Sequence, residues 1–186
     1  MTELRLGSIL MFLLRFLVLL PFCLVLWWLI LPYYGMAQAV LVKIMLMHTL
    51  GVVIEAIEIV PEGILNTKTQ FIIHARTVSR GISLGDLATN IAPYAALILA
   101  TVQIPLRSRL RALAMGIGVL MFCHWTYIIL AFYFAKTIRN APSLPAAFAE
   151  VFLTLPFLLW AVFAYSERLS SNRPPEESKS ASGETR

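Results

Sequence analysis

Charged residues are scarce in this chain, and acidic ones most of all. Of its 186 residues 13% are charged, with 10 Asp and Glu against 15 Lys and Arg, whereas 59% are hydrophobic. Mean hydropathy is +0.80. A soluble domain of this length does not have such a composition, so the chain is predicted to be a membrane protein. The net charge of +5 does not require a nucleic-acid partner, because Lys and Arg beside apolar segments ordinarily fix membrane topology.

Cysteine is almost absent. The two cysteines, Cys23 and Cys123, lie inside apolar runs, where we expect small buried hydrophobic side chains and neither a disulfide nor a metal ligand. Residues 79–118, where a polar segment leads into an apolar helix and an arginine-rich turn, contain no cysteine, no serine–histidine pair and no metal-ligand set. The sequence therefore offers no metal site and no ready nucleophile there.

Four apolar segments are long enough to cross a membrane, since spanning ~30 Å of hydrocarbon takes about 20 helical residues. They are predicted at 9–31, 87–106, 112–134 and 146–165. The first ends in four aromatic residues, which are typical of the belt at a membrane–water interface: Trp27, Trp28, Tyr33 and Tyr34.

The segment after the first span is apolar but carries charges that would be costly in lipid. We therefore predict an interfacial helix over 35–50. β-branched residues dominate afterwards, and the turn signal Pro61-Glu62-Gly63 separates two strand-like stretches. Residues 51–75 are predicted to form a β-hairpin outside the membrane, which makes the fold class an all-α membrane protein with four transmembrane helices and a small extracytoplasmic hairpin.

Lys and Arg residues predict the orientation. Nine of the 15 flank the first span, form the turn with Arg107, Arg109 and Arg111, or lie in the C-terminal tail. This bias marks the cytoplasmic side, so both termini are predicted to be cytoplasmic. Residues 1–165 are predicted to be a single membrane domain. Residues 166–186 are rich in Ser, Glu and Pro and are predicted to be a disordered tail.

This order of segments resembles the exosortase/archaeosortase family of membrane proteins. The resembling parts are RFLVLLPFCLVLWWLILPYY, the hairpin and TNIAPYAALILATVQIPLRSRLRALAMGIGVL, which together cover most of residues 9–134. The resemblance implies the scaffold of an integral membrane cysteine transpeptidase that processes C-terminally anchored proteins at the outer face. It also implies the bacterial cytoplasmic (inner) membrane.

The family's catalytic set is a cysteine at the outer mouth of the helix after the hairpin, an arginine on the next helix and a histidine on the one after. A thiolate attacks a peptide carbonyl, and neighbouring cations or proton donors lower the pKa of the thiol. This chain has no cysteine in 86–94, no arginine in 112–134 and no histidine in its final span. It is therefore most similar to non-catalytic relatives, the exosortase H-associated membrane proteins, and we expect no enzymatic activity.

We expect an accessory or structural subunit of a membrane complex, in protein sorting or envelope assembly, with no cofactor. Its partners would be membrane lipids and other integral membrane proteins. One alternative is a small subunit of a respiratory or photosynthetic complex in which His124 binds haem or chlorin, because a histidine inside a span is a functional candidate. We favour a histidine that is hydrogen-bonded to another helix.

A second alternative is an enzyme whose site has moved to an outer-face polar cluster. Asp86 and Asn90 are four residues apart at the start of the second span, and Glu150 lies one turn into the fourth span on the same side. Arg76 and Arg80 come just before them. The cluster would suit a peptide or a polar headgroup, but we favour a helix cap with surface ion pairs.

Two glycines of the third predicted span suggest a contact between helices. Gly116 and Gly118 form a patch of small residues, which lets helices approach closely. We predict a packing role for both.

Overall fold

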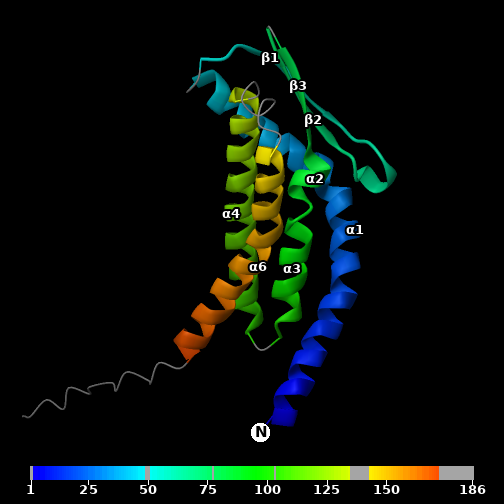
Figure 1. The fold of residues 1–186 in the computed structure, drawn as a ribbon, viewed down its shortest axis with the longest axis vertical. Coiled ribbons are helices and arrows are strands. Elements are labelled where there is room, and N and C mark those ends of the chain that lie inside the picture. The colour runs from blue at the N-terminus through cyan, green and yellow to red at the C-terminus, as the bar shows by residue number, and fades with distance from the viewer. Residues whose placement is uncertain (1, 49–50, 77, 103, 135–142, 172–186) are drawn as a thin grey trace, which may run out of the picture.

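The computed structural model describes residues 2–48, 51–76, 78–102, 104–134 and 143–171. Long helices run side by side, and a small antiparallel sheet covers one end of them (Figure 1). The start of α1 and the end of α6 lie at the other end. The elements in chain order are α1 Thr2–His48, β1 Ile54–Val60, the 3-10 turn η1 Ile64–Asn66, β2 Gln70–Ala75, β3 Val78–Ser83, α2 Leu84–Ala88, α3 Ile91–Ala100, α4 Leu106–Tyr133 and α6 Ser143–Ser171.

The first predicted span and the predicted interfacial helix are one helix. α1 has 47 residues and includes Pro21 and Pro32, so at 1.5 Å per residue it would be ~70 Å long if straight. It is bent, and its second part runs across the ends of the other helices (Figure 1). A helix can continue through a proline with a kink, so residues 35–48 do not form a separate helix as predicted. The interfacial position of this segment stays a prediction.

The second predicted span is interrupted. In place of one helix over 87–106, α2 begins at Leu84, the chain turns at Thr89 and Asn90, and α3 ends at Ala100. Pro93 has no N–H to donate to the carbonyl of Thr89, which accepts from the N–H of Ala92 instead. Pro93 therefore interrupts the helix one turn upstream, at Thr89 and Asn90.

The ends of the other two predicted spans also differ. α4 begins directly after Pro105, six residues before the predicted start at 112, so the three arginines lie in its first turns. α6 begins at Ser143 and continues to Ser171, so residues 166–171 of the predicted disordered tail are helical. Residues 172–186 lie outside the described part of the chain.

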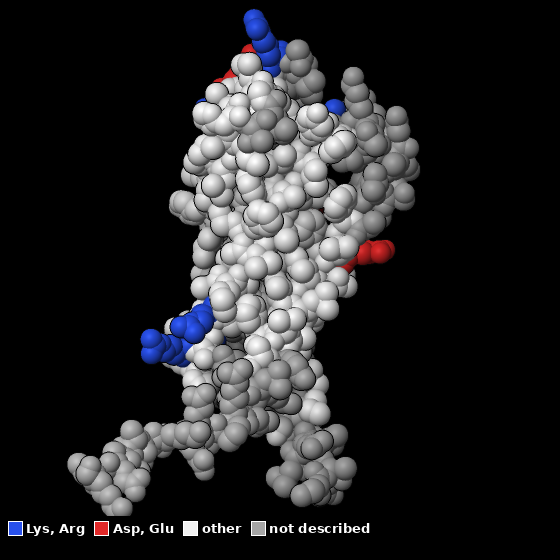
Figure 2. Space-filling view, turned by 90° about the vertical axis from the view of Figure 1, so that its left-hand side faces the viewer, with Lys and Arg blue, Asp and Glu red and all other residues white. Residues whose placement is uncertain are grey.

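Two of the described helices are long and apolar enough to cross a membrane, at Gly7–His48 and Leu106–Tyr133. The apolar stretches Leu84–Ala100 and Glu150–Ala164 are shorter. The predicted mostly helical class with a small β unit is confirmed. The number of four spans remains a prediction. On the face in Figure 2, charged side chains gather at the top and at one lower edge, and the middle is white apart from an acidic group at the right.

The predicted hairpin is part of a three-stranded sheet. β1 pairs with β2 and β2 with β3, all antiparallel. Phe71 and Ile73 on β2 are fully buried. On the opposite face, His74 Nε2 lies 3.5 Å from Glu58 Oε2, and its Nδ1 hydrogen-bonds to Ser79 Oγ at 2.9 Å. β3 was missed because VSRGIS is short, polar and interrupted by glycine, a composition that strands ordinarily avoid.

β3 leads directly into α2, and the two are joined to the β1–β2 connection. The backbone N–H groups of Leu84 and Gly85 donate to the carbonyl of Thr69 at 2.9 and 3.3 Å. Gly85 lies so close to the backbone of Thr67 that a Cβ would collide with the Thr67 carbonyl oxygen and come within 3.0 Å of the carbonyl carbon. This contact seats the sheet on the helices.

We expect Gly85→Ala to destabilise the protein by about 1–3 kcal/mol, because the methyl group overpacks against backbone that cannot easily shift. The measurement is thermal unfolding in detergent micelles. Gly81→Ala is the matched control, since the nearest atom to its new Cβ would be Gln70 Oε1 at 3.9 Å. Equal unfolding temperatures for the two variants would contradict the close contact.

Candidate functional site

A buried polar cluster joins α1 to α4. One face of α4 is buried at every fourth position, through Ala112, Gly116, Leu120, His124 and Ile128. His124 is fully buried, and its Nδ1 lies 2.7 Å from the hydroxyl of Tyr34 on α1. Gln38, one turn further along α1, donates from Nε2 to the Tyr34 hydroxyl at 2.7 Å and to the Met121 carbonyl at 3.2 Å.

The direction of these hydrogen bonds follows from the donors available. Because the Tyr34 oxygen accepts a hydrogen bond from Gln38, its own O–H is free to donate to Nδ1 of His124. A neutral imidazole then carries its proton on Nε2. Within the described residues Nε2 of His124 and Oε1 of Gln38 are buried without a hydrogen-bond partner. The cluster is therefore a chain of hydrogen bonds from Gln38 through Tyr34 to His124, and it ends at the buried Nε2–H of His124.

Aromatic rings enclose the cluster. The Phe152 ring on α6 lies 5.4 Å from the His124 ring, and the Tyr34 ring meets His124 edge-on at 6.1 Å. Trp27 packs edge-on against Tyr34 at 5.1 Å. An axial ligand of haem or chlorin would have to use Nε2 of His124, because Nδ1 is engaged by Tyr34. His124 is fully buried against Phe152, so no space for a macrocycle is open beside that nitrogen in this structure. No group of three or more His, Cys, Asp or Glu in the described residues could hold a metal ion.

The predicted outer-face cluster is dispersed. Asp86 is exposed on α2, and its backbone N–H donates to Ser83 Oγ at 3.4 Å. Asn90 lies in the break between α2 and α3, so the two do not share a continuous helical face. Asn90 is buried and donates from Nδ2 to the Phe152 carbonyl at 3.1 Å, while its Oδ1 has no partner among the described residues. Asn90 thus joins α3 to α6.

The charged members of that cluster do not form ion pairs with one another in the described structure. Arg80 is half-buried on β3, and Arg76 lies exposed between β2 and β3. Glu150 is exposed on α6. Within the described residues the ion-pair distance is met only by Glu58 and His74. The geometry therefore shows a helix cap at Ser83 and an interhelical amide, but no assembled acid–base site.

The two glycines of α4 have different surroundings. Gly116 is buried, and a Cβ there would overlap the phenol ring and hydroxyl of Tyr94 on α3. That hydroxyl donates to the Ala112 carbonyl at 2.6 Å. Gly118 is exposed, and a Cβ added to it would meet no atom within 4 Å. Gly116 makes the contact between α3 and α4, and Gly118 faces outward.

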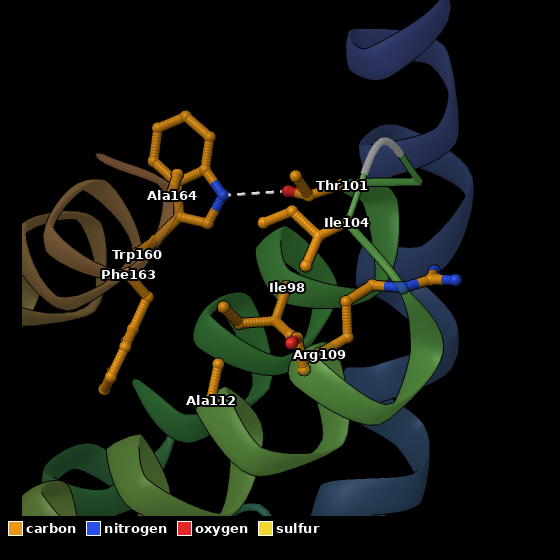
Figure 3. A pocket seen from close by; sticks show the side chains of 9 residues that line it. Ile98, Thr101, Ile104, Arg109, Ala112, Trp160, Phe163 and Ala164 are labelled. Atoms are coloured by element: carbon orange, nitrogen blue, oxygen red, sulfur yellow. Dashed lines mark hydrogen bonds between the residues drawn. The ribbon is translucent and has the colours of Figure 1, made fainter. Parts of the chain in front are cut away.

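A small hollow lies between the end of α3, the start of α4 and α6. Figure 3 shows the side chains that line it. Trp160 Nε1 donates to Thr101 Oγ1 across it at 2.9 Å, and Arg109 Nη1 donates to the Leu99 carbonyl at 3.3 Å. Arg109 thereby satisfies a carbonyl near the end of α3. The other lining residues are Ile98, Ile104, Ser108, Ala112, Phe163 and Ala164.

Sequence reasoning identifies His124 but not its partners. Tyr34 falls in the predicted aromatic belt, and Gln38 lies inside the predicted interfacial helix without a role of its own. The spacing of Tyr34 and Gln38 could have indicated a shared polar site, because residues four apart lie on the same face of a helix. Nothing in the sequence tied Tyr34 to His124, a residue 90 positions away.

Two long apolar helices, a buried polar contact between them and a small sheet at one end define a mostly helical protein with two helices long enough to span a membrane. The chain belongs to the exosortase H-associated membrane protein family, whose family model matches residues 7–137. The matched part includes the sheet and all of α2, α3 and α4. Comparisons with curated proteins and with solved structures gave no match. The resemblance seen in the order of segments is thereby confirmed.

We expect Tyr34→Phe to lower stability by about 1–3 kcal/mol, because it leaves buried groups on Gln38 and His124 unpaired. Thermal unfolding in detergent micelles measures the loss. Tyr33→Phe removes the same hydroxyl from a side chain that is 71% exposed and should have little effect. A loss of similar size in both variants would show that the buried hydrogen bonds do not carry the effect.

The α4 glycines provide a second matched pair. Gly116→Ala should cost about 1–3 kcal/mol, because the methyl group displaces Tyr94 from its hydrogen bond with Ala112. Gly118→Ala should be neutral or stabilising by up to about 1 kcal/mol, since alanine favours helix more than glycine does. The same unfolding measurement applies, and a reversed order would refute the contact with Tyr94.

Proposed function

We propose that the protein is a non-catalytic accessory subunit of a membrane complex that contains an exosortase-type transpeptidase. It would hold its partners in the complex and would perform no bond cleavage itself. Its place would be the bacterial cytoplasmic membrane, with several spans and both termini in the cytoplasm. The observation that carries the proposal is the match of residues 7–137 to exosortase H-associated membrane proteins.

The side chains present support a role without catalysis. No cysteine stands between Asp86 and Tyr94, where the resemblance places the nucleophile. His124 is enclosed between Tyr34 and Phe152, so it is poorly placed to exchange protons with a substrate at the surface. The cluster is better suited to be a structural link between α1 and α4, of the kind that polar side chains form between membrane helices.

The ends of the molecule support the proposed orientation. The start of α1, the first turns of α4 and the end of α6 lie together, opposite the sheet (Figure 1). The first turns of α4 carry Arg107, Arg109 and Arg111. Clustered arginines beside apolar helices favour the cytoplasmic side, and the sheet would then face the periplasm.

Exposed apolar side chains support contacts with lipid and with other membrane helices. On α4, Met115, Val119 and Phe122 are 47%, 41% and 60% exposed. Large exposed apolar surfaces of this kind are rare on soluble monomers and are typical of lipid-facing or partner-facing helices. Gly118, between them in sequence, leaves space for close approach of a partner helix.

The test is co-purification from the native membrane combined with site-specific crosslinking. A photoreactive amino acid at Val119 or Phe122 should yield an adduct with an exosortase-type protein, identified by mass spectrometry after extraction in mild detergent. The same amino acid at Val18, exposed on α1, is the comparison position. The proposal predicts a stoichiometric complex and a position-dependent adduct.

Other results would redirect or end the proposal. A stoichiometric set of respiratory or photosynthetic subunits with visible absorption would replace the sorting role with one in energy transduction. Sorting of anchored proteins that fails in Asp86→Asn while the complex still forms would indicate a relocated active site. A protein that purifies alone and forms no adducts would contradict the subunit role.

A further inference from the structure

The connection between β1 and β2 ends in an exposed apolar tip. Ile64 is 85% exposed and Leu65 is 41% exposed, both in the turn η1. Exposing an isoleucine side chain to water is unfavourable, so another surface is expected to cover it. The backbone around it adopts an unusual shape, since Leu65 and Asn66 have positive φ values of 55° and 64°, a conformation that bulky residues such as leucine rarely adopt. The tip is thus held in a defined conformation that presents apolar side chains.

The tip is attached to α1 at the level of the aromatic residues that end its first apolar segment. Nδ2 of Asn66 donates to the carbonyl of Trp28 at 3.5 Å. The connection runs down beside α1 from the sheet (Figure 1). Trp28 and the exposed Tyr33 are the kind of side chains found at a membrane–water interface. The hydrogen bond therefore places the tip at the depth of that interface.

Four backbone N–H groups that follow the tip are paired within the same turn. The N–H groups of Asn66, Thr67, Lys68 and Thr69 donate to carbonyls within residues 62–66 at 2.9–3.3 Å. Irregular backbone ordinarily avoids lipid because unpaired polar groups are costly there. Four internal hydrogen bonds lower that cost and let the tip enter the headgroup layer.

We propose that η1 is a membrane anchor whose Ile64 and Leu65 side chains insert into the lipid leaflet on the sheet side of the membrane. Lys68 is exposed next to the tip and suits the lipid phosphates. Glu62, exposed on the other flank, suits the positive amines of zwitterionic headgroups. The anchor holds the sheet close to the bilayer surface. Without it, the sheet would be held only through the face that packs on α1.

Spin labels attached to cysteine test the insertion in the full chain, reconstituted in vesicles of phosphatidylcholine mixed with phosphatidylglycerol. Ile64→Cys reports on the tip, and Glu55→Cys, exposed near the far end of β1, is the matched control. The unsubstituted protein, labelled in parallel, gives the background from Cys23 and Cys123. Collision with oxygen, which concentrates in lipid, is compared with collision with a water-soluble nickel chelate.

We expect the ratio of oxygen to nickel accessibility to be several-fold higher at position 64 than at position 55. Equal ratios, with both labels open to nickel, would overturn the proposal because the tip would lie in water. A label at 64 that is shielded from both reagents would also overturn it, since the tip would then be covered by protein. To exclude a label that itself prevents folding, the labelled variants must unfold at the temperature of the unsubstituted chain. A label at Leu65→Cys provides an independent reading if the first variant fails this check.

Discussion

The hydrogen bond between Tyr34 and His124 is the contact on which the arrangement of the long helices depends. In apolar surroundings a polar side chain is stable only when another part of the protein pairs with it. α1 contributes a phenol and an amide, and α4 contributes an imidazole and a backbone carbonyl. These groups meet only when the region of α1 just after Pro32 lies against the upper half of α4. The cluster therefore fixes where α1 meets α4, while the first part of α1 packs on α3 around Cys23, Ala92 and Ala96.

The second part of α1 and the sheet follow from that contact. Beyond Tyr34, α1 buries Gln38, Val42 and Leu46 at four-residue intervals, so one face of this second part of α1 packs on the protein. The same segment approaches the sheet at Gly35, where a side chain would come within 2.9 Å of Leu84 and 3.2 Å of Ile59. A larger residue there would separate the helix from the sheet. The sheet is thus held by α1 on one side and by the junction of β3 with α2 on another.

How far the sequence predicts this structure depends on the range of the interactions. Apolar runs and turn signals act over a few residues, and they correctly placed most of the helical regions and two strands. The break at Thr89 was missed because Pro93 acts one turn upstream and the apolar pattern continues through it. The third strand was missed because its place is set by pairing with β2, not by its own composition. In the candidate site, burial of a histidine inside a span was predictable from hydropathy, but its partner was not.

By itself the sequence indicated a membrane protein whose segments resemble the exosortase family, because composition and segment order can be read directly. It also determined where lysine and arginine lie along the chain. Only the tertiary structure decided that the first span and the interfacial segment are one bent helix, that Gly116 is enclosed and Gly118 open, and that Asp86 and Asn90 are separated by a helix break. Only the fold joined Tyr34 to His124. The reason is physical: hydropathy and local turns depend on neighbours in sequence, whereas hydrogen bonding and close packing depend on which distant helix faces each side chain.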